Sequence, residues 1–538
     1  METLAADLRT MVRTPLTDEH VTAMRRAGRV EMFEAGREVI SVGVPAHQFI
    51  YVLSGEVEAY NPATGERYGI ATLGPGQFAG EISFLNGGSA MLSMRTCVDS
   101  ELLIVERETM LELMARIPEA SDIIVTVMAA RRRRLLESNE SALHLIGDEA
   151  DRSLRRLAAF ASRNRIPYRR KTPDQEDAQK MAEACNIDLS RPGVVFGETR
   201  VDDPSPRAVA RLLGLDLALD PETVHDVLIV GGGPAGVAAA VYAGAEGLSA
   251  LVLEDLAIGG QAGTSSRIEN YMGFPTGISG ADLVWRGEVQ AMKFGTRFAV
   301  PRRATALEVS ENGENFCVTL DDGDMTQARA LVIATGVQYR RLPLPRLAEF
   351  EGAGVYYAAT EVEARWCRAS EVAVIGGGNS AGQAAMFLSR SAKHVHLLVR
   401  GPSLASSMSS YLSSRLEADP RITIHYRTEV TELHGDSALT CINIRDKMMG
   451  QDWRLDTRAL FVMVGAAPNT DWLSGHVALD EKGFVQTGQT VGASSAYATS
   501  TPGIFAVGDV RAGSVKRVAS AVGEGSVVIS RAWDWLNR

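Results

Sequence analysis

Residues 227–236 read Val227-Leu-Ile-Val-Gly231-Gly-Gly233-Pro234-Ala235-Gly236, an apolar run that leads into a Gly-x-Gly-x-x-Gly turn. A strand, this turn and a helix form a dinucleotide-binding unit, because glycines permit a tight turn and let the backbone approach a pyrophosphate. The pyrophosphate then lies at the N-terminus of the helix. The stretch therefore predicts an α/β domain that binds a dinucleotide through Gly231, Gly233, Pro234, Ala235 and Gly236.

The same pattern occurs a second time, as Val372-Ala-Val-Ile-Gly376-Gly-Gly378-Asn379-Ser380-Ala381. Two such units in one chain indicate one flavin and one nicotinamide cofactor. The second cofactor would contact Gly376, Gly378, Asn379, Ser380 and Ala381. The alternative is a pair of glycine-rich turns in α/β sheets that bind no nucleotide.

Length and composition describe an ordinary multidomain protein. The 538 residues suffice for about three or four domains, and 45% hydrophobic and 22% charged residues are typical of globular chains. The net charge of −11 argues against a protein that coats nucleic acid. The first residues, without a basic start or an apolar run, do not predict a secretory signal, and no stretch approaches the ~20 apolar residues that cross a bilayer. Five well-separated cysteines without metal-ligand spacing favour a cytoplasmic protein with structural thiols: Cys97, Cys185, Cys317, Cys367 and Cys441.

Further residues of the first unit are suited to hold FAD. Glu254 ends the second strand, 18 residues after Gly236, where a carboxylate accepts the hydroxyls of an adenosine ribose. The small residues around Gly260 would let a planar ring lie against the backbone, with hydrogen bonds from Gln261 and Asn270. Two strand-to-turn motifs follow, and the helix after the second aims its N-terminus at the flavin. They add Thr335, Gly336, Gly508, Asp509 and Val518 to the predicted FAD site.

The order of these motifs resembles that of the low-molecular-weight thioredoxin reductases, from His225 to the last residue. The resemblance rests on Gly-Gly-Gln, Ile-Glu-Asn-Tyr-x-Gly-Phe-Pro, Ala-Thr-Gly, Gly-Gly-Gly-Asn-Ser-Ala and Gly-Asp-Val. It implies two nested Rossmann-like domains, FAD held by residues 225–342 and 467–538, and NAD(P)H held by the inserted residues 343–466. By the same analogy the protein is expected to be a homodimer.

The redox Cys-x-x-Cys of that family has no counterpart in this chain. Aligned from Gly354, its two places are taken by Ala358 and Glu361; aligned back from Gly376, they are taken by Ala359 and Val362. Cys367 lies five or six residues too late and has no second cysteine nearby, so we interpret it as structural. The catalytic residues are therefore unknown, and relay to thioredoxin by thiol–disulfide exchange is not expected.

The choice between NADPH and NADH depends on the end of the second strand of the inserted unit. NADP-preferring relatives hold the 2′-phosphate with three arginines near this point. Here Arg400 remains, while Gly401 and Ala405 take the other two places, and no acid stands there to select NAD. NADPH is favoured slightly over NADH.

Residues 1–140 resemble the cyclic-nucleotide-binding jelly roll, with short β runs separated by Gly and Pro and a closing helix. Gly80-Glu81 matches the family's ribose-binding Gly-Glu, but Ser89-Ala90-Met91 stands where its phosphate-binding arginine belongs. Without that bidentate partner, ordinary cyclic nucleotide binding is not expected. The alternative is a degenerate jelly roll kept for assembly or regulation. Residues 131–134 are four consecutive arginines, interpreted as a mostly solvated face, and no helix-turn-helix follows that would indicate nucleic acid binding.

Residues 141–218 resemble a glutaredoxin-type thioredoxin fold without redox cysteines. The resemblance places Pro192 where the family has a cis-proline before its third strand. A helical linker domain is the alternative.

The sequence therefore predicts a multidomain FAD-dependent NAD(P)H oxidoreductase. Its electrons would pass directly from the flavin to an unidentified small molecule or redox protein, as in thioredoxin-reductase-like ferredoxin or flavodoxin reductases. One alternative is a flavin-based sensor of redox or NAD(P)H status that signals through the jelly roll. The other is a thioredoxin-disulfide reductase that works by an atypical route. No nucleic acid and no membrane partner is expected.

Overall fold

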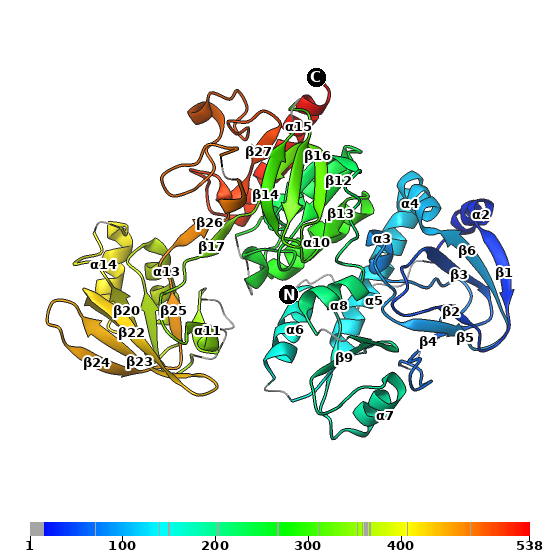
Figure 1. Ribbon diagram of the computed structural model, residues 1–538, viewed down its shortest axis with the longest axis horizontal. Coiled ribbons are helices and arrows are strands. Elements are labelled where there is room, and N and C mark those ends of the chain that lie inside the picture. Colours follow the sequence, from blue (N-terminus) through cyan, green and yellow to red (C-terminus); the bar gives the residue numbers. More distant parts are fainter. Residues whose placement is uncertain are drawn as a thin grey trace.

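A computed structural model represents all 538 residues of the chain. It describes residues 15–69, 72–138, 140–148, 151–201, 204–265, 268, 270–310, 313–351, 353–357, 359, 364, 367–405, 407–473 and 475–538. Figure 1 shows the parts side by side, with the jelly roll and the inserted nucleotide domain at opposite ends and the FAD domain between them.

The first part is a small β sandwich closed by helices. One sheet has the order β1-β6-β3 and the other β2-β5-β4. The strands are β1 (Arg29–Phe33), β2 (Glu38–Ile40), β3 (Gln48–Ser54), β4 (Val57–Tyr60), β5 (Ser93–Thr96) and β6 (Ser100–Glu106). The helices are α2 (Asp18–Ala27), α3 (Ser83–Asn86), α4 (Arg107–Arg116) and α5 (Pro118–Ser138).

The four arginines of α5 do not form the solvated face expected from the sequence. Arg132 is buried and ion-paired with Glu81, Arg131 donates to the carbonyl of Gly80 at 2.8 Å, and Arg133 lies 3.5 Å from Asp282. Arg134 alone among them is exposed. The interpretation was wrong because consecutive helical residues point in all directions, and α5 is packed between the jelly roll and the next domains.

Residues 141–218 form a four-stranded sheet in the order β10-β9-β7-β8. Its strands are β7 (Leu143–Ile146), β8 (Arg169–Lys171), β9 (Gly193–Phe196) and β10 (Thr199–Val201), and its helices α6 (Arg152–Arg163), α7 (Glu176–Cys185) and α8 (Pro206–Leu212). The bond before Pro192 is not cis; the cis peptide bond lies at Val300–Pro301.

The FAD domain is built on a seven-stranded sheet in the order β13-β12-β11-β16-β15-β14, with β27 beside β16. Its strands are β11 (Val224–Val230), β12 (Ala250–Leu253), β13 (Arg297–Ala299), β14 (Ala304–Val309), β15 (Phe316–Leu320), β16 (Met325–Ile333) and β27 (Ile504–Ala506). Three helices, α9 (Pro234–Ala245), α10 (Gly280–Lys293) and α15 (Val518–Leu536), pack with it. Because β27 pairs with β16, the segment between them is an insertion.

Two antiparallel strands, β17 (Val337–Tyr339) and β26 (Ala466–Pro468), connect the inserted domain to the FAD domain. They are visible as the link at the centre left of Figure 1. Its main sheet has the order β18-β25-β19-β20-β21. The strands are β18 (Val355–Tyr356), β19 (Glu371–Ile375), β20 (His394–Val399), β21 (Ile422–Tyr426) and β25 (Leu460–Val462). Helices α11 (Leu347–Phe350), α13 (Asn379–Leu388) and α14 (Ser410–Ala418) accompany it, with a second sheet of β22 (Thr428–Gly435), β23 (Leu439–Asp446) and β24 (Asp452–Asp456).

Helix α10 joins the FAD domain to both front domains. Its Asp282 accepts from Arg165, which follows α6, at 2.6 Å, and also faces Arg133 of α5. Lys293, at the other end of α10, pairs with Asp122 of α5 at 2.7 Å. One apolar core runs through this contact and includes Ile124 and Met128 of α5. No helix in the described part of the chain is long and apolar enough to cross a membrane.

Candidate active site

The first glycine-rich turn connects β11 to α9 and leaves open space in which the pyrophosphate of a dinucleotide would lie. Gly231 has φ +111°, and a Cβ there would fall 2.3 Å from the carbonyl of Ala334. A Cβ on Gly236 would fall 1.8 Å from the carbonyl of Gly231, so this glycine permits the helix to pack against the turn. A Cβ on Gly233, in contrast, would meet nothing within 4 Å. The space beside Gly233 is where the predicted pyrophosphate fits, at the start of a helix that has no side-chain cap.

A cavity of about 790 Å³ opens at this turn. Its size is within the range of cofactor sites. It brings together twelve of the predicted FAD residues: Gly231, Gly233, Pro234, Ala235, Glu254, Gly260, Gln261, Thr335, Gly336, Gly508, Asp509 and Val518. Gly236 packs against the turn and does not line the cavity. Asn270 is exposed and does not line the cavity either.

Glu254 lies in the cavity wall, at the position the sequence assigned to a ribose partner. Its carboxylate accepts from the backbone N–H of Gly232 at 2.7 Å and of Leu256 at 3.0 Å. Burial raises the pKa of this carboxyl, and these hydrogen bonds oppose the rise. A carboxylate has about four acceptor sites, so these bonds orient Glu254 and leave acceptor capacity for a ligand hydroxyl.

The opposite wall comes from the C-terminal part of the chain. Asp509 is held beside the start of α15, whose first residues Arg517, Val518 and Ala521 line the cavity. Burial raises the pKa of Asp509, and the charge of Lys516 partly offsets that effect. The N-terminus of α15 has no side-chain cap, so its first N–H groups have no side-chain partner at this edge of the cavity.

Sequence reasoning missed several residues of this cavity. Thr335 donates to the carbonyl of Asn469 at 2.9 Å, and Asn469 returns a hydrogen bond to the carbonyl of Thr335 at 2.9 Å. Arg163 reaches the cavity from α6, in another domain. No local motif marks these positions, which come from distant segments that only the tertiary fold unites. The missed lining residues include Arg163, Arg302, Arg303, Asn469, Trp472 and Lys516.

These features together fit FAD. The open cradle at Gly233, the uncapped helix start and the surrounding basic side chains suit a pyrophosphate, and the carboxylates suit ribose and ribityl hydroxyls. The glycines and Gln261 would accommodate the ring system.

The second glycine-rich turn repeats this geometry between β19 and α13. Gly376 has φ +145°, and a Cβ there would lie 2.3 Å from the carbonyl of Met463. Gly378 is the N-cap of α13, without a side-chain cap, and Asn379 and Ser380 are exposed at its first turn while Ala381 is buried beneath it. The side chain of Asn379 accepts from the N–H of Ser409 at 2.9 Å, which fixes the neighbouring loop.

Arg400 is exposed just after β20, at the edge predicted to hold the 2′-phosphate. The structure adds a second arginine there. The backbone N–H of Arg427 donates to the carbonyl of Gly401 at 3.0 Å, so the backbone of this exposed residue lies next to Arg400, while its guanidinium donates to the sulfur of Met448. The pairing of β20 with β21 brings the two together across 27 positions of sequence, which no local pattern reveals.

The jelly roll has a site of its own around Glu81, the residue matched to the ribose contact. Arg132 donates to Glu81 Oε2 through Nε at 2.9 Å and Nη2 at 2.5 Å, and also to the hydroxyl of Ser83 at 2.8 Å. The Glu81 carboxylate is therefore already neutralised by a buried guanidinium.

Comparisons with known proteins agree with this geometry. Residues 225–525 match the model of the family described as pyridine nucleotide-disulphide oxidoreductase. The chain belongs to this family. Residues 30–117 match the cyclic nucleotide-binding domain. The predicted class, a FAD-dependent NAD(P)H oxidoreductase, is thereby confirmed, as are the cyclic-nucleotide-binding and thioredoxin-reductase-like parts of the predicted multidomain fold.

Relatives of this chain include thioredoxin reductases. The chain is 35% identical to that of Mycolicibacterium smegmatis over 317 residues, 59% of this chain and 97% of that protein. It is 34% identical to that of Streptomyces clavuligerus over 303 residues, 56% of this chain and 91% of that protein. The crystal structure of Lactococcus lactis thioredoxin reductase is 29% identical and covers 58% of this chain and 99% of its own, with a TM-score of 0.49.

The redox cysteines expected of a pyridine nucleotide-disulphide oxidoreductase are absent from this sequence. No two of its five cysteines are closer than 50 residues. Ala358, Glu361 and Val362, which take their places in the two alignments, lie outside the described residues, and Ala359 is half-buried. Cys367 is 1% exposed and packed in the apolar core of the inserted domain, in agreement with its structural interpretation.

Proposed function

We propose that this oxidoreductase passes electrons from NADPH through FAD to an external acceptor without an internal dithiol. The observation that carries the proposal is the cysteine inventory: the five cysteines are dispersed, and the one nearest the second glycine-rich turn is buried. Bound FAD supplies a carrier that takes two electrons as hydride and releases them to the acceptor.

The thiols of the chain are poorly suited to attack a disulfide. Thiol–disulfide exchange needs a thiolate that the substrate can reach. Burial raises the pKa of the Cys97, Cys185 and Cys317 thiols and so favours their protonated form. Cys441 and Cys367 are buried.

The residues of the cavity bind and orient rather than react. Glu254 and Asp509, on different walls, offer carboxylate oxygens that can accept hydrogen bonds from ligand hydroxyls. Thr335 and Asn469 each donate to the other's carbonyl and so hold two lining segments together. Arg302, 2% exposed, holds Asp322 at 2.6 Å and Asp324 at 2.8 Å and also pairs with Asp216. Through the buried pair of Arg302 and Asp216, this cluster anchors the cavity wall to the segment that follows α8.

Anaerobic reduction by NADPH, followed by a screen of acceptors, tests the proposal. We expect rapid bleaching of the flavin, turnover with at least one dithiol-independent acceptor, and no reduction of thioredoxins. Cys367→Ala should leave the turnover unchanged, as should the matched variant Cys441→Ala, which also removes a buried thiol. Thioredoxin reduction lost in Cys367→Ala but kept in Cys441→Ala would contradict the proposal. Slow bleaching without turnover on any acceptor would instead support a flavin-based sensor.

A further inference from the structure

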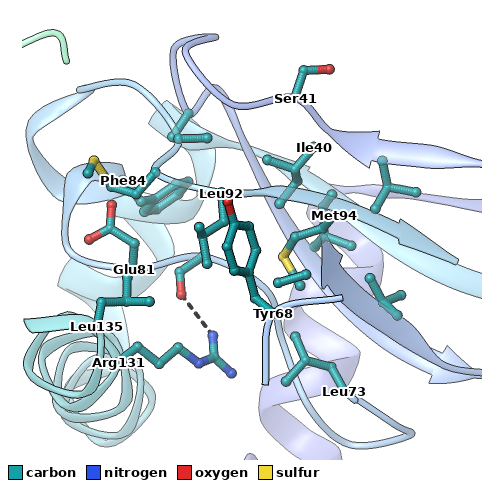
Figure 2. A pocket seen from close by; sticks show the side chains of 18 of the residues that line it. Ile40, Ser41, Tyr68, Leu73, Glu81, Phe84, Leu92, Met94, Arg131 and Leu135 are labelled. Carbon is teal, nitrogen blue, oxygen red and sulfur yellow. Dashed lines mark hydrogen bonds between the residues drawn. The ribbon is translucent and has the colours of Figure 1, made fainter. Parts of the chain in front are cut away.

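The jelly roll encloses a second cavity, of about 500 Å³, separate from the flavin site. Figure 2 shows that aliphatic side chains make up much of its lining, together with the rings of Tyr68 and Phe84 and the charged side chains of Glu81 and Arg131. Ile40, Leu73, Leu92, Met94 and Leu135 face it. An interior of this kind favours an apolar guest, because displacing water from aliphatic surface is the main source of binding free energy.

The side chains that a cyclic nucleotide needs are either paired with another residue or absent. Glu81 lines the cavity, but its carboxylate is paired with the buried Arg132. The wall where a phosphate would lie consists of Ala90, Met91 and Leu92. A phosphate placed against this wall would lose its water without gaining a cation from any of these three residues, which is strongly unfavourable.

Among the polar side chains that line the cavity, Tyr68 and Arg134 are suited to bind a guest. Tyr68 lines the cavity, and its hydroxyl is buried at the cavity edge and forms no hydrogen bond with any described residue. Burial raises the pKa of this hydroxyl to about 12, so it stays protonated and can donate. Arg134 lines the cavity with an exposed guanidinium, and the carboxylate of Glu140 lines it nearby. Arg131 is committed to the carbonyl of Gly80 and to the ring of Phe78, 5.1 Å away.

We propose that this cavity binds an amphiphile, with an aliphatic chain among the apolar side chains and one polar head group that accepts the hydrogen bond of Tyr68. A carboxylate head would gain further from Arg134, whereas an alcohol head would depend on Tyr68 alone. A buried hydroxyl without a partner is unfavourable, and a guest that satisfies it removes that penalty. The proposal does not depend on the redox function of the other domains.

The same helix that lines the cavity contacts the FAD domain. Arg134 and Leu135 of α5 face the cavity, while Arg133 approaches Asp282 of α10. Helix α10 in turn packs on α9, the helix of the first glycine-rich turn. A guest in the jelly roll is thus one helix away from the domain that holds the flavin.

Calorimetry on the full-length, FAD-loaded protein tests the proposal, with decanoate, 1-decanol and cAMP as probes at monomeric concentrations. We expect decanoate and 1-decanol to bind and cAMP to bind at least tenfold more weakly than either. Leu92→Trp should weaken both aliphatic probes at least tenfold by filling the cavity. Met32→Trp, on the exposed side of β1 in the same domain, should change nothing.

Two further variants keep the test decisive if Leu92→Trp fails to fold. Tyr68→Phe should weaken both aliphatic probes about tenfold, because the head group loses its hydrogen bond. Arg134→Ala should weaken decanoate and leave 1-decanol unchanged, while Arg116→Ala, an exposed arginine of α4, should affect neither. Binding of neither aliphatic probe, tighter binding of cAMP, or full binding by Tyr68→Phe would overturn the proposal.

Discussion

Arg132 Nη2 lies 2.5 Å from Glu81 Oε2, and the two side chains are only 9% and 12% exposed. This ion pair joins α5 to the loop before α3. Breaking a buried pair from one side leaves an uncompensated charge, which is more costly than replacing both partners by neutral groups. The pair therefore has a structural role in addition to its consequence for ligand choice.

Arg132→Met is expected to destabilise the protein by about 3–5 kcal/mol, because Glu81 would remain buried without a cation. Urea denaturation followed by circular dichroism measures the change. The double variant Glu81→Gln/Arg132→Met should recover most of the loss. Equal stability of the single and double variants would show that the pair does not control this packing.

Gly233→Val should abolish FAD retention, because its side chain would enter the open space beside the turn where the pyrophosphate fits. The ratio of flavin to protein absorbance after purification measures retention. Gly523→Ala, on α15 in the same domain, is the matched control: its added methyl also meets nothing within 4 Å, but it does not line the cavity. A yellow Gly233→Val protein would contradict the placement of FAD.

Arg400→Ala should raise the KM for NADPH roughly 10- to 100-fold, the effect of losing a charge-assisted hydrogen bond, and change the KM for NADH little. Arg427→Ala should shift the same preference in the same direction, because the backbone of Arg427 is hydrogen-bonded to Gly401, the residue after Arg400. Steady-state kinetics with both nucleotides measures the two effects. Arg454→Ala, an exposed arginine on β24 of the same domain, serves as control. Equal losses for NADPH and NADH would mean that these arginines do not recognise the 2′-phosphate.

Stability should fall as pH rises from about 4.5 to 7, through Glu288 of α10. Burial raises the pKa of its carboxyl from 4.5 to about 7, against the opposing charges of Arg165 and Arg132. Within this window the folded protein keeps a proton that the unfolded chain has lost, so the free energy of unfolding decreases with pH and levels off above 7. Glu288→Gln should flatten this slope, as measured by melting temperature across pH, whereas Glu246→Gln, at an exposed position, should not. An unchanged slope in Glu288→Gln would assign the dependence to other groups.

Much of the flavin site was predictable because it is built from local motifs. Each strand–turn–helix unit is encoded within about ten residues, where the need for glycine at Gly231 and Gly376 follows directly from the backbone. Glu254 and Asp509 are at strand ends fixed by the same pattern. These residues therefore line the cavity as expected, whereas Asn270, taken from a loop with no periodic pattern, does not.

What the sequence could not reveal depends on contacts between distant segments. The role of Arg132 becomes visible only when α5 packs beside Glu81, 51 positions earlier in the chain. Arg163 enters the flavin cavity from a different domain, and Arg427 reaches Arg400 through strand pairing. A charge run gives no information about which of its members is buried, since that depends on the partner surface.

The apolar core that passes from α5 into α10 has a practical consequence for anyone who divides this chain. Trp285, Val289 and Met292 of α10 belong to the same core as Ile124 and Met128 of α5. A fragment trimmed to the flavin and nucleotide domains would carry this face uncovered, together with the unpaired carboxylate of Asp282. Such a fragment should self-associate in solution, and its apparent subunit number would report the cut surface rather than the assembly of the intact chain.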